Sequence, residues 1–354
     1  MLTTSIVIIL IPATIAFIAG MLGAPILINY LYAQKAWKKK AGKQALDGNI
    51  AHEFNKLHIH NEVRAPRMGG IVVWASATVT IMMLSLLSYL FPSPVTKELD
   101  FLSRGQTWIP LATLLIGAFV GLIDDLLVIR PSGEGLRLRY RLITVVVLST
   151  CIAWWFWAKL GVTAINIPFS SPLEIGWLLI PFFVFVSLCL YASGVIDGVD
   201  GLSGGVFATI FASYTIIAFA QNQIDLAAFT ASIAGGLLAF LWFNVPPARF
   251  YMSDTGTMAL TLTLGVVALM TDNLGEGIGI AVLPIIGMLL VITVLSDIAQ
   301  VISKTFFGTK LFRIAPLHHH FEAIGWSSAK VTMRYWILSV MFSFLGVILA
   351  LLAI

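Results

Sequence analysis

The chain has 354 residues, of which 59% are hydrophobic and only 11% are charged. Its mean hydropathy of +0.95 is higher than the core and surface of a water-soluble protein can give together, so a soluble fold is excluded. The formal net charge of +4 is small for this length and selects no partner by itself, and no nucleic-acid partner is expected.

Apolar runs of about 20 residues, the length that a helix needs to cross a bilayer, recur along the whole chain. They are continuously apolar and do not alternate with a period of two, which indicates helices and not a barrel of strands. We therefore predict an all-α integral membrane protein in which residues 1–354 form a single polytopic domain. About ten transmembrane helices are predicted, over residues 5–32, 68–91, 107–125, 139–158, 175–193, 203–220, 226–243, 257–271, 277–300 and 331–353.

The loops between these spans differ strongly in their content of basic residues. One set of alternate loops and helix ends holds all but three of the 21 Lys and Arg residues, the exceptions being Lys97, Arg104 and Lys159. Basic loops are retained in the cytoplasm, so this set is predicted to be cytoplasmic, with both termini on the other side. An active-site cleft is expected on the cytoplasmic face, because the longer loops with the unusual residues lie there.

The two cysteines, Cys151 and Cys189, both fall inside predicted spans. We interpret them as unpaired, small buried hydrophobic residues with no disulfide or metal role.

Carboxylates occur at the ends of several spans, where their cost raises a functional hypothesis. Asp124 and Asp125 close the third span, and Asp254 precedes the eighth. Asp197 and Asp200 follow the fifth span in the run Asp-Gly-Val-Asp-Gly. A single aspartate of this kind could be no more than a helix cap. Five on the predicted cytoplasmic side suit Mg²⁺, which prefers hard oxygen ligands and commonly bridges carboxylates to substrate phosphates.

Three consecutive histidines, His318, His319 and His320, lie in the last predicted cytoplasmic loop. They could not all face one metal ion from a regular helix, so we predict a loop from which one or two reach a phosphate or orient a neighbour. A zinc site is the alternative. It has weak support, because no further His or Cys lies nearby at a suitable spacing.

Arginines flank the predicted acidic site. Arg67 precedes the second span, and Arg137, Arg139 and Arg141 alternate after the Asp-Asp pair. Guanidinium groups bind phosphate through two parallel hydrogen bonds, so a lipid phosphate or a pyrophosphate is a natural partner. The alternative for each of them is a topology signal at a cytoplasmic helix end.

Taken together, these motifs resemble the polyprenyl-phosphate N-acetylhexosamine-1-phosphate transferase superfamily, glycosyltransferase family 4. The Asp-Asp pair at 124–125, the run Asp-Gly-Val-Asp-Gly-Leu from residue 197, and Phe-Asn-Val-Pro-Pro-Ala from residue 243 leading to Asp-Thr-Gly at 254–256 carry that resemblance. The segment Phe-Arg-Ile-Ala-Pro-Leu-His-His-His-Phe-Glu at 312–322 resembles specifically the phospho-N-acetylmuramoyl-pentapeptide transferase branch.

The resemblance implies an Mg²⁺-dependent phosphotransferase of peptidoglycan synthesis. It would transfer phospho-N-acetylmuramoyl-pentapeptide from its UDP derivative to undecaprenyl phosphate, giving lipid I and UMP. It would be a multi-pass protein of the bacterial inner membrane, surrounded by the lipid bilayer, with its active site facing the cytoplasm. The resemblance leaves open whether the protein forms a homodimer. The alternatives are a transferase of another UDP-N-acetylhexosamine, such as the GlcNAc donor, a membrane transporter, and a catalytically silent relative.

The same resemblance implies roles for individual residues. Asp254 would be the magnesium ligand, and Asp124 or Asp125 would deprotonate or position the lipid phosphate. His318, His319 and His320 would contact the phosphates, and Arg67 and Arg139 would be further substrate-binding residues. The nucleoside side would be lined by Asp197, Gly198, Asp200, Asn244 and Tyr251, the last stacking on uracil. Positions that differ from the usual family pattern are Glu62, Ala65, Arg67, Val128, Tyr191, Gly194, Tyr251 and Ser253.

Overall fold

The computed structural model describes residues 2–38, 65–103, 105–131, 133 and 135–353, so Glu62 and Arg104 lie outside the described residues. The long helices are α1 (Leu2–Ala33), α3 (Ile71–Leu90), α5 (Trp108–Val128), α6 (Leu138–Leu160), α7 (Leu179–Ser193), α8 (Leu202–Ala220), α9 (Ile224–Asn244), α10 (Ser253–Leu269), α12 (Met288–Phe307) and α14 (Ser328–Leu352). The shorter elements are α4 (Pro94–Glu98), the antiparallel pair β1 (Ala164–Ile165) and β2 (Leu173–Glu174), the 3-10 turns η1 (Gly176–Leu178) and η2 (Gly194–Ile196), the π turn η3 (Met270–Leu274), α11 (Gly279–Ile286) and α13 (Leu317–Ala323).

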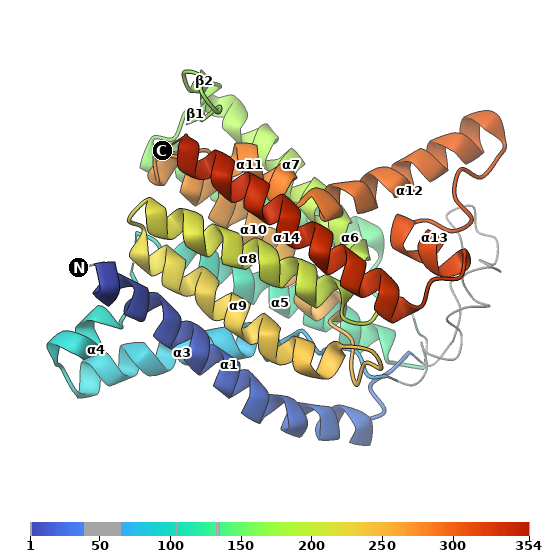
Figure 1. Ribbon diagram of the computed structural model, residues 1–354, viewed down its shortest axis with the longest axis horizontal. Coiled ribbons are helices and arrows are strands. Elements are labelled where there is room, and N and C mark those ends of the chain that lie inside the picture. The colour runs from blue at the N-terminus through green and yellow to red at the C-terminus, as the bar shows by residue number, and fades with distance from the viewer. Residues whose placement is uncertain (1, 39–64, 104, 132, 134, 354) are drawn as a thin grey trace.

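In the described part of the chain, ten helices are long and apolar enough to cross a membrane. Each of the ten predicted spans overlaps one of them, so the prediction of an all-α integral membrane protein is confirmed. Both termini lie at one end of the helix bundle with α4 and the β1–β2 hairpin, and α13 lies at the other end (Figure 1). An even number of crossings places both chain ends on the same side.

The ninth predicted span, 277–300, is wrong as a single helix. The chain forms α11 up to Ile286 and then α12 from Met288, with Gly287 between them at φ −91° and ψ 24°, outside helical geometry. The apolar run hides this break, because hydropathy does not register the backbone freedom of a glycine that follows Pro284 by three residues. The helix long enough to span is Met288–Phe307. It diverges from the bundle toward α13 (Figure 1).

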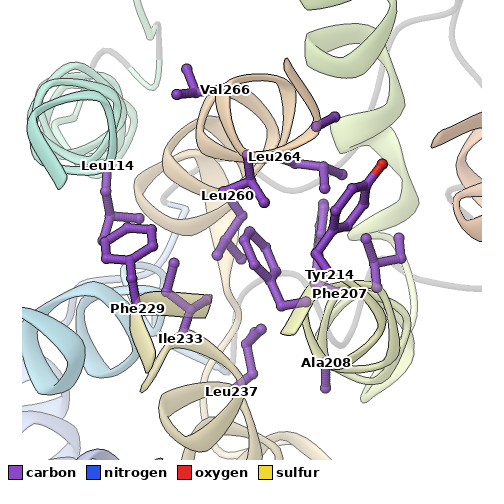
Figure 2. Packing of buried hydrophobic residues seen from close by; sticks show 14 of the residues in the cluster. Leu114, Phe207, Ala208, Tyr214, Phe229, Ile233, Leu237, Leu260, Leu264 and Val266 are labelled. Atoms are coloured by element: carbon purple, nitrogen blue, oxygen red, sulfur yellow. The ribbon is translucent and has the colours of Figure 1, made fainter. Parts of the chain in front are cut away.

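The central helix of the bundle is α10, which is almost entirely buried inside the protein. It packs against α5, α7 and α8. Figure 2 shows apolar side chains from α5, α8 and α9 meeting around Leu260 and Leu264 of α10, among them Leu114, Phe207, Tyr214 and Phe229. Such packing drives helix association in lipid, where the hydrophobic effect between helices is absent. The buried core therefore fixes where both ends of α10 lie.

Cys151 and Cys189 are both free, as predicted, but the expectation that they are buried is wrong. Both are exposed on the outer faces of α6 and α7, where a bilayer would surround them. Apolar composition alone does not tell a face that packs on protein from one that packs on lipid.

The three histidines do not lie in a loop, which corrects that prediction. They belong to α13, a short helix that begins after Pro316. Proline suits this place, since the first helical residues need no internal hydrogen-bond donor. The rings of His318 and His319 lie side by side, with their centroids 4.4 Å apart, and His320 points elsewhere. His318 and His319 are buried, and His320 contacts Phe312.

A second polar centre lies at the opposite end of α10. Asp272 is fully buried, and its carboxylate accepts hydrogen bonds from the backbone N–H groups of Asn166 at 3.0 Å and Ile280 at 3.1 Å. The Asn166 side chain in turn donates to the carbonyls of Asp272 and Gly277. These bonds join the residue after β1 to η3, which follows α10, and to the start of α11.

Candidate active site

The site forms where the carboxyl end of α5 meets the amino end of α10. Close approach of the two helices depends on Gly121, because a Cβ there would lie 2.1 Å from the carbonyl oxygen of Asp254. Asp124 and Asp125 follow one turn later on α5, and Asp254 lies in the first turn of α10. The amino end of a helix stabilises a negative charge, whereas the carboxyl end does not. The α5 aspartates therefore need cationic partners.

The carboxylates of Asp124, Asp125 and Asp254 come together, with one oxygen of each within 4.8 Å of the others. Asp124 and Asp125 are buried, and the side chain of Asp254 is 26% exposed. Asp254 thus forms the open edge of the cluster. Three hard oxygen donors at this spacing fit Mg²⁺, which commonly keeps several waters and uses one or two carboxylates.

Asp125 has both carboxylate oxygens engaged. Oδ2 accepts from the Ser253 hydroxyl at 2.5 Å, from the Thr255 backbone N–H at 2.9 Å and from the Thr255 hydroxyl at 2.5 Å. Oδ1 accepts from Nε of Arg67 at 2.8 Å. A carboxylate that accepts this many bonds inside the protein holds the start of α10 in place.

Asp124 is less engaged than its neighbour. Its Oδ1 accepts from the backbone N–H of Leu136 at 2.5 Å, and its Oδ2 lies 3.6 Å from Nη1 of Arg141. Asp124 therefore faces a cation through Oδ2 and accepts fewer short hydrogen bonds than Asp125 does.

Two arginines bracket the cluster. Arg67 bonds Asp125 and lies 3.3 Å from Oδ2 of Asp254, and Arg141 lies 3.5 Å from Oδ1 of Asp254. Burial acts to lower the pKa of Arg67, but the charges of Asp125 and Asp254 outweigh it and raise that pKa. Arg67 therefore stays cationic under all working conditions.

The loop between η2 and α8 joins this cluster to the histidines. Asp197 accepts from the Ser203 hydroxyl at 2.6 Å and from the backbone N–H of Ser253 at 2.7 Å. Burial raises the pKa of Asp197, and these hydrogen bonds together with the charge of Arg67 oppose the shift. The next residue, Gly198, lies directly under the histidines.

His318 and His319 both direct Nε2 at Gly198, where a Cβ would lie 2.8 Å and 2.5 Å from those nitrogens. The other nitrogen of His319, Nδ1, lies 2.8 Å from Oε2 of Glu322. Oε1 of Glu322 accepts from the Ser328 hydroxyl at 2.7 Å. An ionised Glu322 requires the proton on Nδ1, which leaves Nε2 of a neutral His319 as an acceptor.

Other predicted residues serve the loops around the site. Asn244 is buried, accepts from the backbone N–H of Gly201 at 3.0 Å and donates to the carbonyl of Phe250 at 2.8 Å. Asp200 accepts from the backbone N–H of Ala248 at 3.0 Å. Tyr251 is half-buried. Through these bonds the segments 197–201 and 244–251 are fixed to each other.

Two predicted residues lie apart from the acidic cluster. Arg139 is exposed and turns to its neighbour Tyr140, with Nη2 2.8 Å from the hydroxyl oxygen and the guanidinium 4.6 Å above the ring. Nδ1 of His320 accepts from the backbone N–H of Arg313 at 3.2 Å. Their predicted roles toward phosphates stay predictions.

Sequence reasoning named Arg141 with Arg137 and Arg139 near the acidic site but gave the substrate-binding role to Arg139, because only the helical phase of α6 decides which of them faces α5 and α10. It missed other members of the site. Glu322 lies three residues after His319, a spacing that places both on one helix face and could have indicated the pair. Ser253 and Thr255 flank Asp254, where hydroxyls next to a helix start are common as caps and raise no signal.

Comparisons with known proteins agree with this site. A family model described as "Glycosyl transferase family 4" matches residues 107–272, a range that includes all five predicted aspartates, from α5 to the start of α10. A phospho-N-acetylmuramoyl-pentapeptide-transferase of Clostridium perfringens (strain 13 / Type A) is 33% identical over 340 residues, which cover 94% of this chain and 95% of that protein. The chain belongs to the phospho-N-acetylmuramoyl-pentapeptide-transferase family.

Further members of this family align over a similar extent. The enzyme of that name from Caldanaerobacter subterraneus subsp. tengcongensis is 32% identical over 94% of both chains. The one from Listeria monocytogenes serovar 1/2a is 31% identical over 91% of this chain and 92% of its own length. The resemblance stated from the motifs is thereby confirmed over nearly the whole chain, and the chain is a multi-pass membrane transferase of this family.

Proposed function

We propose that this chain transfers phospho-N-acetylmuramoyl-pentapeptide from its UDP derivative to undecaprenyl phosphate, giving lipid I and UMP. The observation that supports this most directly is the cluster of Asp124, Asp125 and Asp254 between two arginines, at the end of a membrane-spanning bundle. Phosphoryl transfer depends on positioning and on stabilising negative charge, and this cluster offers both carboxylates for a metal ion and guanidinium groups for phosphate oxygens.

The two α5 aspartates would divide the work. Asp124, whose outer oxygen faces Arg141 at 3.6 Å, would accept the proton of the lipid phosphate or orient it for attack. Asp125 would hold the start of α10, since its oxygens already accept four hydrogen bonds. These contacts favour Asp124 over Asp125 as the proton acceptor, a choice that the sequence leaves open.

Asp254 would hold Mg²⁺, which supplies charge stabilisation at the phosphates when bound. The exposed edge at Asp254 gives access to the donor. His319, whose Nδ1 proton is held by Glu322, would take a second proton on Nε2 and donate it to the donor phosphates. The segments fixed by Asn244 would carry the uridine.

The end of the bundle that carries the acidic cluster would face the cytoplasm of a bacterial inner membrane. Support comes from the sequence, in which the set of alternate loops and helix ends that includes Asp124, Asp125 and Asp254 holds all but three of the Lys and Arg residues. A water-soluble UDP donor made in the cytoplasm would then reach the cluster without crossing the membrane.

The test is a transfer assay with the purified protein, undecaprenyl phosphate, Mg²⁺ and a labelled UDP-sugar. We expect label in the lipid with the muramoyl-pentapeptide donor, and loss of transfer in Asp254→Asn. Asp225→Asn, at the start of α9, is the matched control and should keep its activity. Label in lipid from the GlcNAc donor alone would reject the proposed donor, and retained biological function of Asp254→Asn would favour a catalytically silent relative.

A further inference from the structure

Both carboxylate oxygens of Asp254 already face a fixed positive charge. Nη2 of Arg67 lies 3.3 Å from Oδ2, and Nη1 of Arg141 lies 3.5 Å from Oδ1. Each arginine also reaches back to α5, Arg67 to Asp125 at 2.8 Å and Arg141 to Asp124 at 3.6 Å. The two positive guanidinium groups thus balance two of the three carboxylate charges. The cluster keeps one net negative charge, which attracts a divalent cation.

We propose that Arg67 and Arg141 occupy the cation position of the acidic cluster until substrate arrives, so that a divalent cation and a phosphate-bearing substrate bind cooperatively. The cation takes over the carboxylates, and the guanidinium groups that it displaces take the phosphate oxygens. This inference rests on the proposed function, because it assigns the phosphate-binding groups of the same site.

The physical reason is the cost of separating half-buried charges. A cation alone would leave both guanidinium groups beside it, repelled and without a partner, which is costly away from bulk water. A phosphate alone would meet carboxylates of its own sign. With both present, every charge has a partner of opposite sign, and phosphate offers arginine the same two-oxygen geometry as a carboxylate.

The side chains are placed so that this exchange is possible without unfolding. Arg67 and Arg141 are each 25% exposed, and Asp254 is 26% exposed, so all three reach the open edge of the cluster. Arg67 lies before α3, outside any helix, whereas Arg141 lies in the first turn of α6. Both positions let a long side chain swing outward while its backbone stays in place.

Binding of Mn²⁺ to the full-length protein, followed by electron paramagnetic resonance of the free ion, tests the coupling directly. In the wild type we expect weak binding of Mn²⁺ alone and an increase in affinity of about tenfold or more when UMP is added, within the usual range of coupling between two sites. A parallel titration replaces UMP by a short polyprenyl phosphate, which tells whether the nucleotide or the lipid phosphate receives the guanidinium groups. Coupling with either one supports the proposal.

Variants of the two arginines test whether these side chains compete with Mn²⁺ for the carboxylates. Arg67→Gln and Arg141→Gln should each bind Mn²⁺ alone about tenfold more tightly, because a competing cation is removed, and should lose most of the coupling to UMP. Arg67→Lys should keep the weak binding of Mn²⁺ alone. Arg130→Gln, an exposed arginine two residues after α5, makes the same change of net charge and should bind like the wild type.

Equal Mn²⁺ affinity with and without either phosphate compound, or unchanged Mn²⁺ affinity in both glutamine variants, would overturn the inference. The transfer assay is run on the same preparations. A wild type that transfers the labelled donor but shows no coupling contradicts the arginine exchange alone, whereas a wild type that binds Mn²⁺ cooperatively but transfers no UDP-sugar contradicts the proposed function alone.

Discussion

Ser253 donates its hydroxyl proton to Oδ2 of Asp125 across 2.5 Å, and its backbone N–H to Asp197 across 2.7 Å. It does so from a left-handed backbone conformation, with φ +54°, which is uncommon for a residue with a side chain. One residue before Asp254, it therefore ties the start of α10 to α5 and to the loop before α8. These bonds keep Ser253 in a conformation that glycine would adopt without strain.

Substitutions at Ser253 should separate the hydrogen bond from the backbone strain. Ser253→Ala keeps the strained backbone and loses the hydroxyl, so we expect about 1–2 kcal/mol less stability. Ser253→Gly also loses the hydroxyl but relaxes the backbone, and should be the more stable of the two. Thermal unfolding in detergent, followed by circular dichroism, ranks the variants. Equal melting temperatures for alanine and glycine would show that the positive φ carries no cost.

A side chain at Gly121 should force α5 and α10 apart. In Gly121→Ala the new Cβ would lie 2.1 Å from the carbonyl oxygen of Asp254, closer than backbone atoms tolerate. We expect lower stability, by about 1–3 kcal/mol as for other overpacked sites, and at least a tenfold weaker binding of Mn²⁺. Gly23→Ala in α1 is the control, since nothing lies within 4 Å of its Cβ. Unaltered Mn²⁺ binding in Gly121→Ala would contradict the packing described for this junction.

Glu322 should act on transfer through the orientation of His319. Glu322→Gln keeps the size of the side chain but removes the charge that fixes the proton on Nδ1, and we expect about a 10–100-fold lower kcat with a smaller change in KM. Ser328→Ala should have a weaker effect in the same direction. Steady-state assays at several pH values check this, because a reoriented histidine shifts the pH profile whereas a general loss of folding only lowers the amplitude.

The exposed Glu98 of α4 provides the matched control for that experiment, since Glu98→Gln makes the same chemical change at the opposite end of the bundle. A Glu322→Gln variant with wild-type kcat and pH profile would exclude the positioning role.

Asp272 should contribute to stability and not to chemistry. Asp272→Ala leaves the buried N–H groups of Asn166 and Ile280 without acceptors, and each such loss costs about 1–3 kcal/mol. We expect a markedly lower melting temperature in detergent. The kcat per folded molecule should stay unchanged, because Asp272 lies at the other end of α10 from Asp254. A selective fall in kcat at normal stability would contradict this assignment.

Much of the fold and part of the site could be predicted from the sequence because their signals are local. A run of about 20 apolar residues has few stable arrangements other than a helix across the bilayer, and acidic residues at the ends of such runs are costly enough to indicate function. The convergence of Asp124, Asp125 and Asp254 could be expected from these signals and from the family motifs. The break at Gly287 and the helix at 317–323 could not be predicted in this way, because neither one changes the hydropathy of the sequence.

The sequence by itself determined which kind of molecule this is: a membrane protein of about ten spans with aspartates gathered at one end. Only the tertiary structure decided which charges meet. Arg141 and not Arg139 faces the cluster because residues two apart on a helix point to nearly opposite sides, and the packing of α6 decides which side faces α5 and α10. Asp125 is engaged on both oxygens because α5 and α10 touch at Gly121. Such pairings depend on the relative rotation and distance of helices far apart in the chain, which no local pattern records.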